Sequence, residues 1–466
     1  MDAWTLDITF GDFITDFVFL SVLFLIATLL RRYVPFLQHF LVPNNVVAGI
    51  LGFIFASIIS IPFFEDISSR MGTYVYHLLA LTFIAVGLSQ HKQNFGKAPA
   101  LTGITLVAVY MIQGLIGLGI TFGLIYTIMP DLFPSFGLLM PLSFGMGPGI
   151  SYSIAMNWEQ YGFTDGAITG LTISAVGFII AYVPGIIILR RGIRKGLANF
   201  IDKDADVSEE LKKGIITRKS RKPIAGHLTT SVEAIEPLTL HLSFIGLSYA
   251  ITYLILKLVE LLLFSVGAGT EISTIWSFHF IFATVAAILL RNVIDNTNIS
   301  HLVDSGLMTR LANFFMDFMV AASITAISFA VIQHYIVPIL IMSVVAATAT
   351  YFFIKWATYK FFSDYYFERF VSLFGDMTGT IQSSLVLLRV LDPSFKSRAG
   401  IDLVYGSGFA LFIGFPLLLL INAPMNFFDD LIIGNWYVML SLFLYLILLI
   451  LALSVIGKHF NIGKKN

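Results

Sequence analysis

Long apolar runs recur along the whole chain, and they constrain its fold more than any other feature of the sequence. An apolar run of about 20 residues is long enough to cross the hydrocarbon core of a bilayer as an α-helix. Only 12% of the 466 residues are charged, about half of what a soluble domain carries. The sequence therefore predicts an all-α, polytopic membrane protein. Eleven runs are expected to be spans, namely 13–30, 43–63, 73–90, 101–128, 166–190, 240–265, 274–293, 311–333, 335–357, 399–422 and 435–456.

Composition and missing motifs narrow the functional classes. Lysine and arginine total 28, and aspartate and glutamate also total 28, so no basic field is available to attract nucleic acid. The chain has no cysteine, which excludes disulfides, thiolate metal sites and a cysteine nucleophile. It also lacks a phosphate-binding GxxxxGK[ST] loop and an HExxH zinc motif. We therefore expect that the chain is not an enzyme, that it uses no cofactor and that it has no nucleic-acid partner.

The distribution of lysine and arginine predicts how the chain crosses the membrane. Cytoplasmic loops of membrane proteins carry an excess of these two residues. With the N-terminus outside, 26 of the 28 basic residues fall on the inner side, while Arg70 lies in an outer loop and Lys257 within a span. We therefore expect a multi-pass protein of the cell (inner or cytoplasmic) membrane, with its N-terminus outside and its C-terminus in the cytoplasm.

One long polar segment divides the spans into two sets of five. This segment, residues 191–238, has the mixed charges of a flexible cytoplasmic linker. An odd number of spans before it places the second set upside down relative to the first. The sequence therefore predicts two inverted repeats, at 1–190 and 239–422, and an additional C-terminal membrane helix within 423–466.

Glycine patterns recur at a nearly constant distance between the two sets. Gly177 and Gly408 stand in the similar stretches GFIIAYVPG and GFALFIGFP and differ by 231 positions, and Gly145 and Gly375 differ by 230. These matches are short, but they agree with the inverted relation that the span count predicts.

Two segments between the spans are polar and rich in glycine, at about 135–160 and 368–392. The span count sends the first in from outside and the second in from the cytoplasm, so each is expected to be a re-entrant hairpin. Irregular backbone is tolerated at membrane depth only where it is buried in protein or lines a cavity. In a transporter built from inverted repeats, a pair of such segments is the best indicator of the transport site.

Four stretches in this order resemble the bacterial sodium/glutamate symporter family. They are LVPNNVVAGILGF (41–53), LALTFIAVGLSQHKQNF (79–95), LSFGMGPGISYSIAMNWEQYGF (142–163) and LANFFMDFMVAASI (311–324), and the resemblance covers about residues 13–422. It implies two inverted five-span repeats, two re-entrant hairpins, a homodimer and an elevator-type motion. It also implies sodium-coupled symport of glutamate or of a related amino or carboxylic acid.

Both hairpins depart from the family pattern. The first has Met146 and Pro148 where the family usually carries His and Thr, and the second is poorer in glycine and contains Asp376 and Arg389. These changes fall where the substrate is expected to bind. The sequence therefore predicts a small anionic substrate, most simply a carboxylate.

The candidate substrate ligands combine hydroxyl groups, glycine backbone and one guanidinium. Each serine can donate to a carboxylate or cap its own backbone. Arg389 offers a rigid fork that matches a carboxylate in two bonds, and the alternative is a pair with Asp392 at the cytoplasmic interface. The candidates are Ser143, Gly145, Gly147, Gly149, Ser151, Ser153, Ser383, Ser384 and Arg389.

The candidate sodium ligands are oxygen donors, which hard cations prefer. They are Asp376, Thr378 and Thr380 in the second polar segment, and Asp317 within a span. Sodium is the only metal ion expected. Two alternatives remain open at this point. One is a proton-coupled organic-anion carrier, in which an intramembrane acid carries the proton, and the other is an ion channel.

Overall fold

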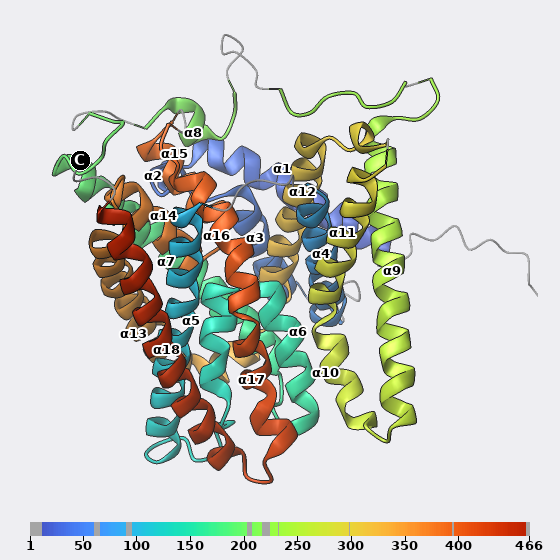
Figure 1. Cartoon of the computed structure of the whole chain (residues 1–466), viewed down its shortest axis with the longest axis vertical. Helices are drawn as coiled ribbons and strands as arrows, with labels where there is room; N and C mark the ends of the chain where they lie inside the picture. The colour runs from blue at the N-terminus through green and yellow to red at the C-terminus, as the bar shows by residue number, and fades with distance from the viewer. Residues whose placement is uncertain are drawn as a thin grey trace, which may run out of the picture.

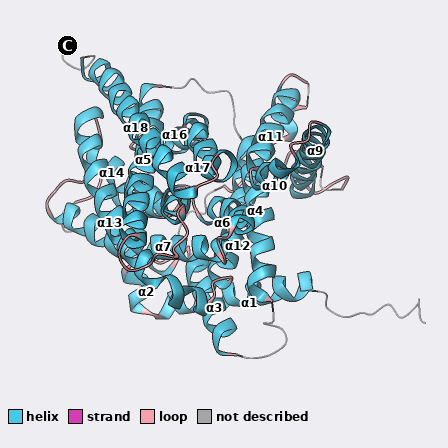
Figure 2. Cartoon of the chain, turned by 90° about the horizontal axis from the view of Figure 1, so that it is seen from below, coloured by secondary structure: helices cyan, strands magenta, loops and turns pink. Residues whose placement is uncertain are grey.

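The structure, a computed structural model, describes residues 12–59, 66–89, 96–202, 207–216, 224–231, 233–297, 299–393 and 396–462. Every regular element in these ranges is a helix, as the sequence predicts, and none is a strand (Figures 1 and 2). The main elements are α1 (Asp12–Tyr33), α2 (Pro35–His39), α3 (Asn44–Ile58), α4 (Ile67–Ser89), α5 (Lys97–Ile125), η2 (Phe136–Leu138), η3 (Pro141–Gly145), α6 (Pro148–Trp158), α7 (Gly166–Arg194), α8 (Glu209–Lys213), α9 (Pro237–Ser265), α10 (Ile272–Ser277), α11 (His279–Asp295), α12 (Ser305–Thr325), α13 (Phe329–Phe361), α14 (Tyr366–Thr378), α15 (Ile381–Leu391), α16 (Ala399–Ile413), α17 (Phe415–Phe427) and α18 (Leu431–Ile462).

Within the described residues, eight helices are long and apolar enough to cross a membrane. The number rises to nine if α16 and α17, which meet at 42°, form one broken span. The other two predicted spans correspond to α3, with 15 residues, and to α11, with 17 residues preceded by the short α10. The count of eleven spans therefore stays a prediction.

One span boundary differs from the sequence prediction. We expected a break near residue 334, but α12 ends at Thr325 and α13 begins at Phe329. The stretch VAASITAISFAVI is apolar on both sides of the actual break. Hydropathy therefore does not mark the turn, which depends on how the two helices pack against their neighbours.

The helices pack into two groups that lie side by side in Figures 1 and 2. The first helix group consists of α1, α3, α4, α9, α11 and α12, with α4 and α12 in extensive contact. The second helix group consists of α5, α7, α13, α14, α15, α16 and α18, arranged around α5 and α13. Helix α6 contacts both groups, because it packs on α7 and also on α4, α10 and α12.

Helix starts recur along the two halves of the chain. Helices α5 and α13 begin at Lys97 and Phe329, which differ by 232 positions, and α7 and α16 begin at Gly166 and Ala399, which differ by 233. These offsets are close to those of the glycine patterns. The inverted orientation of the halves remains a prediction.

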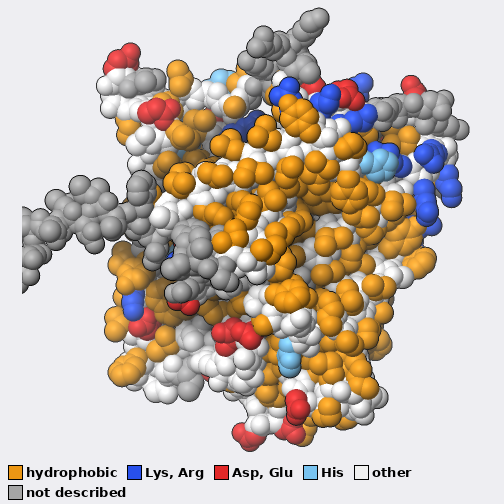
Figure 3. Space-filling model, turned by 180° about the vertical axis from the view of Figure 1, so that it is seen from behind, with side chains coloured by type: hydrophobic (Ala, Val, Ile, Leu, Met, Phe, Trp, Pro, Cys, Tyr) orange, Lys and Arg blue, Asp and Glu red, His pale blue; other side chains and the backbone are white. Residues whose placement is uncertain are grey.

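Charged side chains are unevenly distributed over the surface. In Figure 3, Lys and Arg gather mainly at the upper end and an apolar surface covers the middle, while Asp and Glu appear at both ends. The linker with α8 lies at the same upper end in Figure 1. This arrangement agrees with the lysine and arginine pattern used for the predicted orientation.

Part of the linker is docked on the helices. Arg31, which is buried at the end of α1, donates from Nη2 to the carbonyl of Leu211 at 2.8 Å and from Nε to that of Lys212 at 3.2 Å. Gly214 ends α8 in a left-handed conformation directly over the Arg31 side chain. A simple flexible tether does not describe residues 207–216, because the α1 arginine holds α8.

Candidate functional site

The first polar segment folds as a broken pair of helices, which we call the first hairpin (residues 136–158). A short π-helical turn, η3, is followed by α6, and the break falls at Met146 and Gly147. Gly147 has φ 90° and ψ 172°, a region of backbone conformation that only glycine adopts readily. Pro148 stands at the first position of α6, where its missing N–H costs no hydrogen bond.

The second polar segment also breaks in the middle, and we call it the second hairpin (residues 366–391). Helix α14 ends at Thr378 and α15 begins at Ile381. Thr380 is the N-cap of α15, where its hydroxyl accepts from the backbone N–H of Ser383 at 3.5 Å. The break at Gly379 and Thr380 is thus a defined turn.

The tips of the two hairpins meet inside the protein. A β-carbon built on Gly147 would lie 3.9 Å from Cγ2 of Thr380. Helix α7 lies against both hairpins, because a β-carbon on Gly177 would clash with the carbonyl oxygen of Thr378 and lie 3.1 Å from Phe144. Segments more than 200 residues apart in the sequence therefore converge on one place.

Beside this meeting point lies a buried carboxylate. Asp376, in the last turn of α14, is 5% exposed, and within the described part of the chain it has no hydrogen-bond or ion-pair partner. Tyr110 on α5 lies near enough to feel the charge of the Asp376 carboxylate. One turn further along α5, Gln113 donates to the carbonyl oxygen of Met377 at 2.9 Å. Helix α5 thus reaches the carboxyl end of α14.

The predicted serines of the first hairpin hold the hairpin together. Ser143 and Ser151 hydrogen-bond to each other at 2.7 Å across its two limbs, and Ser143 donates to the carbonyl of Gly170 on α7 at 3.0 Å. Ser153 donates to the carbonyl of Ser277, at the end of α10, at 2.7 Å. All three hydroxyl groups therefore already have protein partners.

The predicted glycines of the first hairpin lie at close contacts. Gly145 packs against the ring of Tyr110. A β-carbon on Gly149 would be 2.6 Å from Leu79 of α4 and 2.9 Å from the sulfur of Met319 on α12. Gly145 therefore faces the second helix group and Gly149 faces the first.

The predicted hydroxyls of the second hairpin have different surroundings. The hydroxyl of Ser383 accepts from Tyr182 of α7 at 2.7 Å and lies 3.5 Å from that of Thr380. Thr378 donates to the carbonyl of Phe374 in its own helix at 2.8 Å. Ser384 is buried between the limbs, and its hydroxyl has no hydrogen-bond partner in the described part of the chain. Thr380 and Ser383 are thus nearest to the tip.

The predicted intramembrane acid Asp317 lies in a polar cluster at the boundary of the two helix groups. Asn45 of α3 donates to Asp317 at 2.8 Å and contacts Gln382 of α15 at 3.4 Å. Gln382 also lies 3.5 Å from Asn313 of α12. The amide of Asn45 thus binds the predicted acid Asp317.

Comparison with protein families decides the class of this molecule. The family described as "Sodium/glutamate symporter" matches residues 8–371, more than three quarters of the chain. The chain belongs to the sodium/glutamate symporter family. Comparison with curated proteins and with solved structures finds no match. Membership confirms the resemblance seen in the sequence and makes the chain a multi-pass transporter of the symport class.

The family match ends at residue 371, inside α14. The tip of the second hairpin, with Asp376 and Thr380, and all of α15 to α18 therefore lie beyond it. Of the two hairpins that depart from the symporter pattern, the first lies inside the match and the tip of the second lies outside it.

Arg389 lies away from the meeting point. It is exposed, in the last turn of α15, nine residues after Thr380, which is about 13 Å along a helix. Asp392, its proposed alternative partner, accepts instead from the backbone N–H groups of Lys396 and Ser397. We therefore leave Arg389 out of the site discussed below, because the tip of the second hairpin is at the other end of α15.

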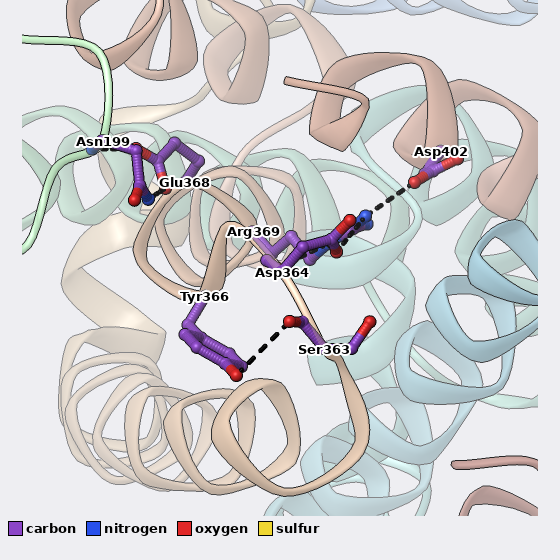
Figure 4. A network of polar contacts seen from close by, with 7 residues as sticks. All are labelled: Asn199, Ser363, Asp364, Tyr366, Glu368, Arg369 and Asp402. Atoms are coloured by element: carbon purple, nitrogen blue, oxygen red, sulfur yellow. Dashed lines mark hydrogen bonds and ion pairs between the residues drawn. The ribbon is translucent and has the colours of Figure 1, made fainter. Parts of the chain in front are cut away.

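A charged network at the base of the second hairpin was not expected from the sequence (Figure 4). Arg369 of α14 pairs with Asp402 of α16 at 2.8 Å and with Asp364 at 3.0 Å. Next to it in the chain, Glu368 accepts from the backbone and side-chain nitrogens of Asn199. An acid within an apolar run, Asp402, was the one sign of this network in the sequence. Its partner Arg369 is 33 residues away and could not be inferred from spacing.

Lys257 and Glu260 stand three positions apart in the sequence, a spacing that puts both side chains on one helix face and predicts an ion pair. Lys257 and Glu260 on α9 are 2.9 Å apart, and Glu260 also accepts from Trp276 at 3.0 Å. Within the described part of the chain, no cluster of three His, Asp or Glu residues suits a transition metal.

Proposed function

We propose that this chain couples the inward movement of Na⁺ to the uptake of glutamate or a related amino or carboxylic acid. The single observation that supports it most is the meeting of the two hairpin tips beside a buried, unpartnered carboxylate. The carboxyl end of a helix carries partial negative charge and the amino end partial positive charge. The end of α14 suits a cation, and the starts of α6 and α15 suit a carboxylate.

In this proposal Asp376 provides the anionic oxygen for Na⁺. Thr378 and Thr380 are its nearest proposed companions in the second hairpin, and Asp317 is a second acid at the boundary of the helix groups. The substrate carboxylate is held near Thr380 and Ser383 and by the free backbone N–H groups of Gly149 and Ile150 at the start of α6.

We propose an elevator-type mechanism for the same reasons. The second helix group carries the second hairpin and holds much of the first, while the first helix group forms the stationary frame. The surface between them is formed on one side by α6 and on the other by α4 and α12, where Gly149 contacts Leu79 and Met319. The proposal includes a homodimer in the cell membrane with the N-terminus outside.

The test is uptake by the purified chain in lipid vesicles. We expect an inward Na⁺ gradient to drive accumulation of radiolabelled glutamate. Unlabelled amino and dicarboxylic acids that the chain also transports are expected to inhibit this labelled uptake. Uptake is expected to saturate and to show counterflow, which a channel does not. Uptake that follows a proton gradient and ignores Na⁺ would show that the proton-coupled alternative is correct.

The variant Asp376→Asn tests whether Asp376 binds the cation without disturbing the fold. The variant removes the charge at nearly constant volume, so expression and melting temperature are expected to change little. The dependence of uptake on Na⁺ concentration is expected to be lost or strongly shifted. If Na⁺ activates uptake by the variant as it does in the wild type, the cation does not bind in this hairpin.

A further inference from the structure

We infer that Gln113 on α5 is a ligand of the coupling cation, together with Asp376, in a site at the carboxyl end of α14. This inference rests on the proposed sodium coupling and adds a residue outside both hairpins. Helix α5 was predicted from its apolar run alone, and Gln113 is a single amide in the stretch MIQGLIG.

The orientation of the Gln113 amide is fixed by its neighbours. The side chain is fully buried, and its nitrogen lies 2.9 Å from the carbonyl oxygen of Met377 and 3.2 Å from the hydroxyl of Thr350 on α13. A carbonyl oxygen only accepts hydrogen bonds, so the nitrogen and not the oxygen of the amide must face Met377. The amide oxygen is therefore directed elsewhere.

That oxygen has no hydrogen-bond partner among the residues that the structure describes. Oε1 of Gln113 is buried without a hydrogen bond, and a β-carbon built on Gly145 would lie 3.2 Å from it. It thus faces the backbone of Gly145, close to the tip of the first hairpin. A buried amide oxygen without a partner is destabilising unless a ligand satisfies it.

The Asp376 carboxylate likewise has no hydrogen-bond or ion-pair partner among the described residues. Tyr110 precedes Gln113 by one turn of α5, packs against Gly145 and interacts with the Asp376 carboxylate. The residue after Asp376 is Met377, whose carbonyl Gln113 holds. A buried carboxylate and a buried amide oxygen, neither with a partner in the described ranges, therefore belong to one region between α5, α14 and the first hairpin.

The chemistry of this pair favours a hard monovalent cation. Carboxylate and amide oxygens are the donors that such ions take, and the carboxyl end of α14 adds partial negative charge. An anion would be repelled by Asp376. A cation held by both oxygens would connect α5 to the second hairpin beside the tip of the first, which gives ion binding a direct effect on the meeting point of the hairpins.

The experiment measures Na⁺ binding without substrate. The purified full chain is melted in detergent over a range of NaCl concentrations, with choline chloride keeping the ionic strength constant, because an ion that binds only the folded state raises the melting temperature. Three variants are compared with the wild type. Gln113→Met removes the oxygen at similar size, Gln113→Glu keeps an oxygen but loses the donor to Met377, and Gln160→Met is a matched control.

We expect the Na⁺ concentration that gives half of the stabilisation to rise at least about tenfold in Gln113→Met, the scale on which lost metal-site groups act. Gln113→Glu is expected to respond to Na⁺ as strongly as the wild type or more strongly, despite lower stability in choline. Gln160→Met is expected to match the wild type, since the Gln160 amide donates to Asn157 and Ser273, just beyond the carboxyl end of α6 and away from the hairpin tips.

The outcomes distinguish this inference from the proposed function. A purely structural Gln113 would give variants that melt lower in both salts with an unchanged Na⁺ midpoint, and that result would overturn the assignment of Gln113 alone. A wild-type chain whose melting temperature ignores Na⁺ would overturn the sodium coupling as well.

Discussion

Gly147 and Thr380 lie against each other where the two hairpins meet, with a β-carbon on Gly147 only 3.9 Å from the Thr380 methyl group. The two residues are 233 positions apart. Each stands at the break of its own hairpin, one in a backbone conformation reserved for glycine and the other as the cap of a helix. The proposed transport site is built around this contact.

Gly147→Ala tests the backbone of the first tip. The φ of 90° is unfavourable for alanine, and we expect a loss of about 1–3 kcal/mol in the free energy of unfolding, with most of the transport lost. Gly119→Ala is the control, because Gly119 lies within α5, is exposed and has nothing within 4 Å of a β-carbon. The control is expected to be neutral or slightly stabilising. Equal melting temperatures for both variants would argue against a constrained tip.

Asp402→Asn tests the anchor at the base of the second hairpin. Asp402 and Arg369 are 1% and 3% exposed, and breaking a buried pair costs about 3–5 kcal/mol. Arg369 keeps Asp364, so we expect a loss near the lower end of that range, measured by thermal or denaturant unfolding. Glu260→Gln breaks the half-exposed pair on α9 and is expected to lower the melting temperature much less. If Asp402→Asn and Glu260→Gln have the same melting temperature, the ion pair of Asp402 does not stabilise the fold.

Ser143→Ala distinguishes a structural serine from a substrate ligand. The variant leaves Ser151 without its 2.7 Å partner and the Gly170 carbonyl without the hydrogen bond that Ser143 donates. We expect stability to fall by about 1–3 kcal/mol, while the apparent affinity of the folded transporter for its substrate changes little. A large loss of affinity at unchanged stability would return Ser143 to the list of ligands.

Arg389→Lys tests the position of the arginine. The sequence alone predicted a bidentate contact with the substrate carboxylate, but the exposed side chain is at the far end of α15 from the tip. We therefore expect wild-type affinity for the transported anion in uptake measurements. A decrease of tenfold or more would show that the sequence-based assignment was right.

Single cysteines in this cysteine-free chain test the orientation. Ile216→Cys lies in the linker and Asp429→Cys between α17 and α18, both at exposed positions. With the N-terminus outside, an impermeant thiol reagent added to intact cells is expected to label Asp429→Cys and to spare Ile216→Cys until the cells are opened. The reverse labelling pattern would show that the predicted orientation is wrong.

The sequence alone determined the class of the fold and the places where the chain is irregular. Apolar runs of span length indicated helices, because an unpaired backbone cannot be left in hydrocarbon. Glycine and proline in the stretches around Gly147 and Gly379 predicted the breaks, since these residues act on their own backbone. The pair of Lys257 and Glu260 followed from helical spacing. Each of these inferences depends on neighbours within a few residues.

Tertiary structure decided which polar residues come together. Gln113 reaches Met377, Asn45 reaches Asp317, and Arg369 reaches Asp402 only because helices far apart in the sequence pack side by side. The same packing gave Ser143 protein partners and left Arg389 facing outward. Hydropathy and spacing carry no record of such contacts, because the energy of a polar group in a membrane protein depends on which other helix it faces.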